Sequence, residues 1–324
     1  MKMFNIFSII ALAAIAMGCG NGSSNNTASS ESSENTVKAV VNFNADSAYA
    51  YTQKQCDFGP RVPETPAHEA CGKWIEQQLN RFCDKVVAQP APVTTFDGKK
   101  LNATNYIGIF NPDATERVLL LAHWDCRPWA DNDPDESKHK EPVMGANDAA
   151  SGTAVLLELA RQMKAKKPGV GVDILLVDAE DWGTDDNEDS WALGTQYWVN
   201  HPHEQGYKAL YGILLDMVGA KGATFHKEGF SCHYAGGIVD SMWETGIGSG
   251  YSGFFKNDEF GMVTDDHIAI NKGGIPCIDI IDMRNGTDAG FFQYWHTTGD
   301  TMDKIDRATL KAVGQTVANY IYGL

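Results

Sequence analysis

Five short apolar runs, separated by segments with helical periodicity, constrain the fold of this chain more than any other feature. The runs lie at residues 106–110, 118–122, 174–177, 213–215 and 278–281. Continuous apolar runs of this length are typical of strands that are covered on both faces. Apolar side chains recur on one helical stripe at residues 74–82, 151–166 and 306–322. The pattern predicts an α/β fold, a three-layer sandwich around a mostly parallel mixed sheet.

The N-terminal segment has the features of an exported leader. Lys2 precedes an apolar run at residues 6–15, and small residues then lead to Cys19. The run is shorter than the ~20 residues that a membrane-spanning helix needs. The small residues before Cys19 resemble the lipobox of bacterial lipoproteins, which implies that residues 1–18 are a lipoprotein signal peptide and that Cys19 is lipidated. The alternative is an ordinary signal peptide that is cut nearby. We expect an exported lipoprotein of the bacterial cell envelope, in the periplasm or anchored to the outer membrane.

The remaining chain divides by composition into a tether and a folded part. Residues 19–38 are rich in Ser, Asn, Gly and Thr without apolar periodicity, so we expect a flexible tether. Residues 39–324 are expected to form a single catalytic domain. An exported location permits disulfides, but the sequence leaves the pairing open among Cys56, Cys71, Cys83, Cys126, Cys232 and Cys277.

The charge of the chain argues against one class of partner. Lys and Arg number 26 and Asp and Glu number 42, which gives a formal net charge of −16. An acidic surface repels phosphate backbones, so we expect no nucleic-acid partner. The same charge favours cationic partners, such as a substrate with a free ammonium group.

Acidic residues and histidines follow the predicted strands. His123 and Asp125 follow the second run, Glu180 and Asp181 the third, and Asp216 the fourth. Ligands of open α/β sheets bind beyond the carboxyl ends of the strands, where successive strand ends meet. We therefore expect these side chains to share one cleft. Carboxylates packed closely raise one another's pKa, and a divalent cation is the simplest compensation.

Three residues are the predicted ligands of a catalytic zinc. Asp148 opens the helix at 151–166, Asp181 follows a strand, and His296 lies near the C-terminus. Carboxylate and imidazole ligands without thiolate suit a catalytic zinc with an open coordination position. The alternative for each is a solvated loop residue or, for Asp148, the N-cap of the helix. Glu180 is the predicted general base, because consecutive residues that leave a strand point in different directions.

These residues, in this order, resemble those of the zinc aminopeptidase superfamily of exopeptidases. Four further stretches, at residues 58–63, 214–220, 265–268 and 295–297, are similar to glutaminyl cyclases, specifically to a bacterial branch of the animal-type enzymes. The resemblance covers the chain from about Cys56 to the C-terminus. It implies a zinc exopeptidase-like fold.

The resemblance also implies an activity, the conversion of N-terminal glutamine of peptides or proteins into pyroglutamate with release of ammonia. One zinc per chain would be held by the three predicted ligands, and Glu180 would carry the proton. Asp216 and Asp265 would form an acidic pair beside the substrate. Trp295 and Phe291 would line the substrate pocket.

Two rival functions stay open from the sequence. In the peptidases of the same superfamily, residues in the positions of His123 and Asp216 hold a second zinc, so a two-zinc aminopeptidase is the first alternative. His123 and Asp125 are accordingly candidates for a second metal site or for supporting the first. A non-catalytic binding lipoprotein of the envelope is the second alternative. The natural substrates and the oligomeric state are not specified by the sequence.

Overall fold

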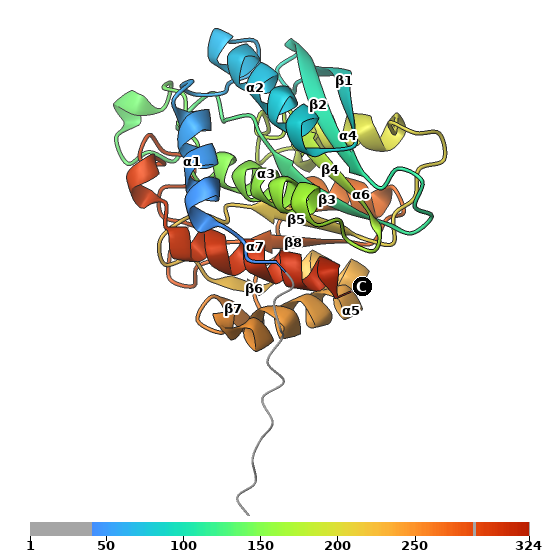
Figure 1. Ribbon diagram of the computed structural model, residues 1–324. Helices are drawn as coiled ribbons and strands as arrows, with labels where there is room; N and C mark the ends of the chain where they lie inside the picture. The colour runs from blue at the N-terminus through green and yellow to red at the C-terminus, as the bar shows by residue number, and fades with distance from the viewer. Residues whose placement is uncertain (1–40, 288–289, 324) are drawn as a thin grey trace, which may run out of the picture. The chain divides into compact units, whose positions relative to one another are not determined.

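The computed structural model describes residues 41–287 and 290–323, which are built around a six-stranded mixed sheet (Figure 1). The strands, in order across the sheet, are β1 (Lys85–Thr94), β2 (Lys100–Phe110), β4 (Gly171–Val177), β3 (Arg117–His123), β5 (Gly212–Asp216) and β8 (Cys277–Ile281). The four strands from β4 to β8 are parallel, whereas β1 and β2 pair antiparallel. The predicted α/β class with a mostly parallel mixed sheet is confirmed.

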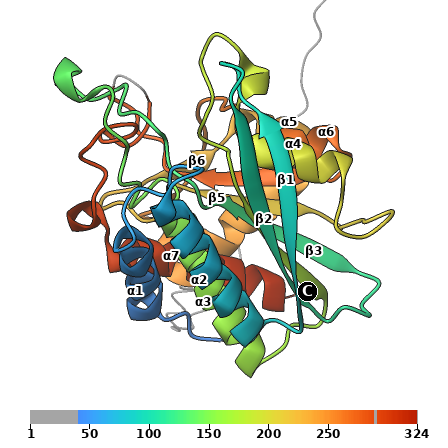
Figure 2. The same ribbon diagram turned by 90° about the horizontal axis from the view of Figure 1, so that it is seen from above.

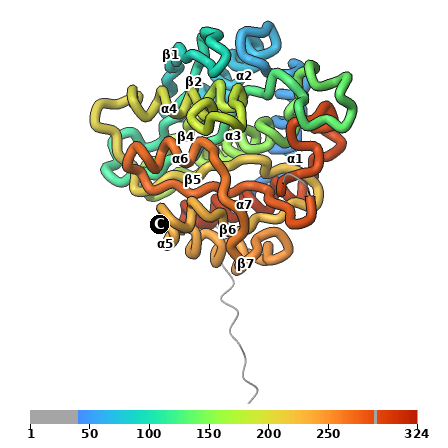
Figure 3. The backbone as a smooth tube through the Cα atoms, turned by 180° about the vertical axis from the view of Figure 1, so that it is seen from behind, coloured from blue at the N-terminus to red at the C-terminus, as the bar shows by residue number. Residues whose placement is uncertain are grey.

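Helices cover both faces of the sheet. One layer consists of α1 (Ala45–Cys56), α2 (Pro66–Phe82), α3 (Ala150–Ala165) and α7 (Arg307–Tyr322). The other contains α4 (Leu193–Asn200) and α6 (Asp266–Lys272). Figure 2 shows the sheet between α2 and α3 on one side and α4 and α6 on the other, and Figure 3 shows α4 and α6 from behind. The helix α5 (Gly229–Gly246) packs on β8 and α7, next to the small sheet of β6 (Phe225–Lys227) and β7 (Phe255–Glu259).

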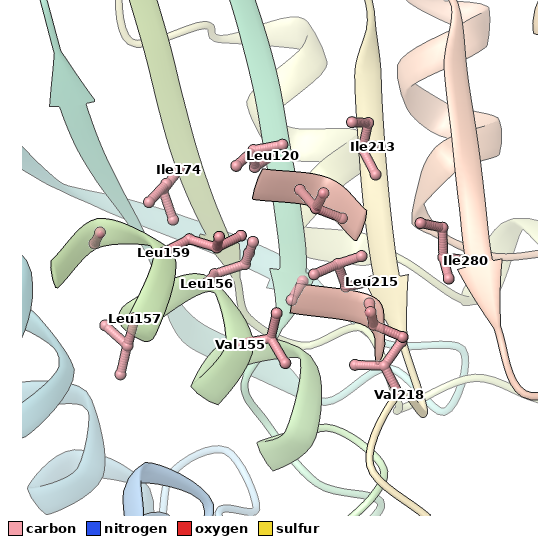
Figure 4. Close-up of a cluster of buried hydrophobic side chains, with 14 of the residues drawn as sticks. Leu120, Val155, Leu156, Leu157, Leu159, Ile174, Ile213, Leu215, Val218 and Ile280 are labelled. Atoms are coloured by element: carbon pink, nitrogen blue, oxygen red, sulfur yellow. The ribbon is translucent and has the colours of Figure 1, made fainter. Parts of the chain in front are cut away.

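Alternate residues of each central strand enter two different cores, which explains the continuous apolar runs. Leu120 of β3 packs in the core beneath α3 and α7, whereas Leu119 and Leu121 pack in a second core with Trp198 of α4 and Ile270 of α6. Figure 4 shows the α3 side chains in the first core beside Leu120 and its neighbours on β5. Burying one such leucine contributes roughly 1.5–3 kcal/mol. Both sheet faces are therefore fixed by burial.

The start of α3 lies unusually close to the sheet. Gly152 permits this approach, because a Cβ atom there would lie 2.2 Å from the carbonyl oxygen of Leu215 at the end of β5. Every residue of α3 from Ala150 to Ala160 is buried. The N-terminal end of this helix is therefore fixed against the end of the neighbouring strand.

The sequence left several elements unpredicted. The edge strand β1 contains Pro90 and Pro92 and is largely exposed, so it has no apolar run to indicate it. The helices α1, α4, α5 and α6 were also not predicted, because their apolar stripes are short or interrupted. The predicted helices and strands are present, with ends that differ by a few residues; α2 begins earlier, at Pro66, and β2 begins earlier, at Lys100.

The predicted signal peptide at 1–18, the lipidation site at Cys19 and the whole tether at 19–38 lie outside the described residues. Among the helices that the structure describes, none is both long and apolar enough to cross a membrane. All six cysteines of residues 41–323 are free thiols, and all but Cys232 are buried.

Candidate metal centre and active site

The structure brings the three predicted zinc ligands together. Asp148 directly precedes α3, Asp181 follows β4, and His296 lies in the loop that leads to α7. His296 Nε2 lies 3.2 Å from Asp181 Oδ1 and 3.8 Å from Asp148 Oδ2. One donor atom from each residue lies within 4.8 Å of the others, and all three side chains are buried. Three segments far apart in the sequence thus aim their donors at one point.

The donors of this group fit a divalent cation of the zinc type. One imidazole nitrogen and two carboxylates form a set without thiolate, which is typical of catalytic zinc sites. Burial raises the pKa of Asp181, and the nearby charge of Asp148 raises it further, although His296 opposes both. Two buried carboxylates this close repel each other, and a cation between them would relieve that repulsion.

Asp148 is not a helix cap. The N-cap position of α3 is Ala149, and no side chain caps this helix. Asp148 Oδ1 instead lies 2.9 Å from His123 Nε2. Its backbone N–H donates to Asp300 Oδ2 at 3.0 Å, and the N–H of Asn147 donates to Asp300 Oδ1 at 2.9 Å. The carboxylate is therefore free to point into the group.

Two supporting interactions were missed by the sequence analysis. Asp300 holds the backbone of Asp148, and burial raises the pKa of Asp300 to about 7. Arg127 donates to the backbone oxygen of Asp181 at 3.2 Å and pairs with Asp131, whose Oδ1 lies 3.7 Å from His296 Nδ1. Asp300 is four residues beyond His296 in a loop, and no strand end marks it. Arg127 follows β3 closely, so its position was a usable signal.

Glu180 and Asp181 lie on a turn that Asp125 holds in place. The N–H groups of Glu180 and Asp181 donate to the two carboxylate oxygens of Asp125, at 3.1 and 3.2 Å. Asp125 is fully buried, and its contacts are those of a positioning residue. Burial raises the pKa of Glu180 well above its ordinary value; the nearby His123 opposes this rise, and the charge of Asp181 adds to it.

The backbone is strained at three points around the group. Ala179, Met217 and His296 have φ values of 55°, 48° and 55°. This left-handed region is uncommon for residues other than glycine, and it concentrates at functional sites. Ala179 precedes Glu180 and Met217 follows Asp216. The strained residues therefore change the direction of the backbone next to the polar residues at the strand ends.

His123 forms a second group that shares Asp148. Its Nε2 lies 2.9 Å from Asp148 and 3.3 Å from Asp216, and its Nδ1 lies 3.4 Å from Asp125. His123, Asp148 and Asp216 also offer donor atoms within 4.8 Å of one another. Burial alone would lower the pKa of His123, but its hydrogen bonds to these carboxylates raise it well above the ordinary value. A protonated imidazole or a second cation would each neutralise this group.

A pocket of about 270 Å³ opens beside the metal-type group. Glu180, Asp216 and Asp265 line it together with Phe291 and Trp295, so all five predicted catalytic and substrate-binding residues face one space. Burial raises the pKa of Asp216 to about 6 and that of Asp265 to about 7, and the nearby charge of Asp216 also raises the pKa of Asp265. The ring of Trp295 stacks on His296 with centroids 3.9 Å apart and lies 4.9 Å from Phe291.

A further buried group lies behind Asp265. Asp265, His267 and Asp279 offer donor atoms within 4.8 Å of one another. Both carboxylate oxygens of Asp279 and Oδ2 of Asp265 have no hydrogen-bond donor among the described residues. Burial raises the pKa of Asp279 well above its ordinary value. Asp279 was missed by the sequence analysis, although a lone acid inside the apolar run at 278–281 was a signal for it.

Comparisons with known proteins agree with this geometry. The sequence profile described as Peptidase family M28 matches residues 105–321. The chain is 52% identical to a Zn-dependent exopeptidase of known structure from Parabacteroides distasonis, with a TM-score of 0.87 over 88% of this chain and 100% of that one. It is 47% identical to a glutaminyl cyclase of Bacteroides thetaiotaomicron, with a TM-score of 0.86 over 88% of this chain and 99% of that one.

A curated relative extends the likeness to animals. The bovine glutaminyl-peptide cyclotransferase is 24% identical over 81% of this chain and 77% of its own length. The profile match covers about two thirds of the chain and includes the residues from β2 to α7 that build the pocket. The chain belongs to peptidase family M28.

Proposed function

We propose that this protein is a zinc-dependent glutaminyl cyclase, which converts N-terminal glutamine of peptides or proteins into pyroglutamate. The observation that carries the proposal is the group formed by Asp148, Asp181 and His296, beside a pocket that Glu180 and Trp295 line. Relatives that share nearly half of their residues with this chain over almost their full length carry the same name. The sequence-based prediction of the activity rests on the same residues.

The side chains of the pocket can perform the ring closure. The α-amine of the substrate attacks its own γ-carbonyl carbon, a new C–N bond forms, and the bond to the amide nitrogen breaks as ammonia leaves. Glu180 accepts the proton that the amine loses and returns it to the departing nitrogen, so no proton is gained or lost overall. A carboxyl group with a raised pKa is suited to both steps near neutral pH. A zinc ion bound by Asp148, Asp181 and His296 would supply Lewis-acid polarisation of the carbonyl.

The pocket walls contribute by holding the substrate folded back on itself. Intramolecular ring closure gains greatly when the reacting atoms are held close. Trp295 and Phe291 line the pocket, and the contacts of the Trp295 ring with His296 and Phe291 limit their movement. Burial raises the pKa of Asp216 to about 6 and that of Asp265 to about 7, so these side chains can accept from or donate to the substrate amide near neutral pH.

We propose one zinc per chain. His123, whose pKa is raised by its contacts with carboxylates, can provide as an imidazolium the positive charge that Asp148 and Asp216 need. Metal analysis of the purified protein is expected to give about one zinc per chain. Two zinc ions per chain would refute this proposal.

A two-zinc aminopeptidase is the second candidate, and one observation favours it. Asp148 belongs to both His–carboxylate groups, as a bridging carboxylate between two metals would. The deciding assay uses glutamine-initiated and leucine-initiated dipeptides, with and without a chelator. Chelator-sensitive ammonia from the glutamine peptides alone supports the cyclase. Free leucine supports the aminopeptidase, and silence from both supports the binding lipoprotein.

We further propose export as a lipoprotein anchored through Cys19. The basis is the short apolar run and the small residues before Cys19 in the sequence. Mass spectrometry of the mature protein is expected to find an acylated N-terminal cysteine at this position. A mature N-terminus at any other residue would refute the proposal.

A further inference from the structure

Arg61 is a fully buried arginine in the segment that links α1 to α2, and the reaction described above does not use it. It is among the largest fully buried side chains of the described residues. The N–H of Cys126, shortly after β3, donates to the carbonyl oxygen of Arg61 at 3.2 Å, so the segment is fixed near the end of the central strands. A buried charge is costly unless its surroundings compensate it.

Backbone carbonyl groups supply that compensation. Nη1 of Arg61 donates to the carbonyl oxygen of Met144 at 2.5 Å, and Nη2 donates to that of Gly145 at 2.6 Å. The Nε atom has no hydrogen-bond partner among the described residues, and within the same part of the chain Arg61 forms no ion pair with a carboxylate. The side-chain hydrogen bonds of this guanidinium therefore go to the main chain of one loop.

The loop that Arg61 contacts leads directly to Asp148. Gly145 has a φ of 63°, and a Cβ atom at this position would lie 2.3 Å from the carbonyl oxygen of Asp148 and 3.1 Å from Nη2 of Arg61. The carbonyl oxygen of Gly145 also accepts from the N–H of Ala150, the first residue of α3, at 3.2 Å. Arg61 therefore packs against a tight turn that ends at a predicted zinc ligand.

Asp300 holds the N–H groups of the same loop. The N–H groups of Asn147 and Asp148 donate to its two carboxylate oxygens at 2.9 and 3.0 Å, and the N–H of Ala146 donates to its backbone oxygen at 3.3 Å. Arg61 takes the carbonyl groups that precede them in the chain. Each residue of 144–148 is therefore held by a buried cation or by a buried acid.

We propose that Arg61 is a positioning residue of the zinc site, which holds the loop 144–148 so that the carboxylate of Asp148 is oriented before the metal ion binds. The inference rests on the zinc site of the proposed function. A guanidinium suits this task because its planar fork donates to two neighbouring carbonyl groups in a fixed geometry, whereas a lysine ammonium keeps the charge but not the fork. A residue that only stabilises the fold would change the melting temperature and leave zinc affinity unchanged.

The test compares Arg61→Lys with Arg117→Lys. Both replace a buried arginine, but Arg117 pairs with Asp173 near the start of β4, at the opposite end of that strand from the zinc site. Competition with a chelator measures the zinc affinity of each metal-free protein. Arg61→Lys is expected to lower zinc affinity about 10–100-fold, as loss of such support typically does. Arg117→Lys should lower the melting temperature and leave zinc affinity near the wild-type value. Equal zinc affinity in the two variants would overturn the inference.

A second measurement reports the geometry of the ligands. Cobalt in place of zinc absorbs visible light according to the arrangement of its ligands, so Arg61→Lys is expected to change this spectrum and Arg117→Lys is not. If Arg61→Lys does not fold, Arg61→Gln takes its place, because it removes the buried charge and retains an N–H donor. A wild-type cobalt spectrum in the Arg61 variant would overturn the inference.

The double variant Arg61→Lys with Asp300→Asn tests whether both residues act on one loop. Residues that act on a shared element are not independent, so the loss of zinc affinity should be smaller than the product of the two single losses. A loss equal to the product would contradict a shared loop. These measurements need no turnover. A protein that binds zinc but forms no pyroglutamate would refute the proposed function and leave the test of Arg61 valid.

Discussion

Two buried acids lie near the two ends of β4, one within the strand and one beyond its carboxyl end, and their surroundings differ. Near its start, Asp173 accepts hydrogen bonds from Arg117 Nε and Nη2, at 2.7 and 2.5 Å, and from the Tyr207 hydroxyl at 2.7 Å. Beyond its end, Asp181 has an Arg127 nitrogen at 3.4 Å and His296 at 3.2 Å, with the carboxylate of Asp148 close by.

The comparison distinguishes a buried carboxylate that stabilises the fold from a buried carboxylate that takes part in the chemistry of the site. Asp173 and Asp181 are almost equally inaccessible, at 0% and 2% exposure. A buried carboxylate with its full set of donors stabilises the fold. A buried carboxylate that is crowded by other acids leaves room for a cation and raises neighbouring pKa values. A substitution near one end of β4 is expected to leave the properties of the other end unchanged.

The largest effect is expected at the carboxyl end, from Glu180→Gln. The amide cannot accept the proton of the amine, so kcat should fall by about 10²–10⁴-fold. The substitution conserves shape and removes no predicted zinc ligand, so zinc content and melting temperature should stay near the wild-type values. Steady-state kinetics and metal analysis check this. Turnover of glutaminamide at the wild-type rate would show that Glu180 is not the base.

Arg117→Ala should produce the opposite outcome at the amino end. It leaves the buried carboxylate of Asp173 without its main partner, which costs about 3–5 kcal/mol in the free energy of unfolding. Denaturant unfolding measures that loss, and kcat is expected to stay unchanged. The double variant Arg117→Met with Asp173→Leu removes both charges and should recover most of the stability. A large fall in kcat at wild-type zinc content would contradict the separation of the two ends.

Asp300→Asn tests the support of the zinc site. The amide offers one acceptor oxygen where the carboxylate offers two, so the N–H groups of Asn147 and Asp148 are held less well. Loss of such support typically lowers metal affinity about 10–100-fold. Competition with a chelator measures the change, and Asp303→Asn, an exposed acid nearby, is the control. Equal zinc affinity in both variants would show that Asp300 does not support the zinc site.

The smallest effect concerns pH. Burial raises the pKa of Asp265 to about 7, whereas an unfolded aspartate titrates near pH 4. Between these values the folded state binds more protons, so this group makes the metal-free protein less stable as pH rises. Asp265→Asn removes the contribution, so the stability of the variant should fall less than that of the wild type between pH 4.5 and pH 7.5. Melting curves in chelator check this, and parallel pH profiles would contradict it.

The sequence was informative wherever burial acts on consecutive residues. The central strands were predictable because both of their faces are covered, and residues such as Asp181 and Asp216 were found because they lie at or shortly beyond the carboxyl ends of those strands. Asp300 and Asp279 were not found. Asp300 reaches Asp148 through a loop whose path depends on tertiary packing, and Asp279 lies within a strand, so the pattern of polar residues at strand ends does not include it.

The prolines of β1 have a consequence for self-association. β1 is one of the two outer strands of the sheet, and a free edge invites another chain to add a strand by backbone hydrogen bonding. Pro90 and Pro92 have no N–H group, yet β1 stays paired with β2 along its length. An approaching strand therefore meets gaps in the row of donors at this border. The residues that concealed β1 in the sequence also protect the folded protein from polymerising through it.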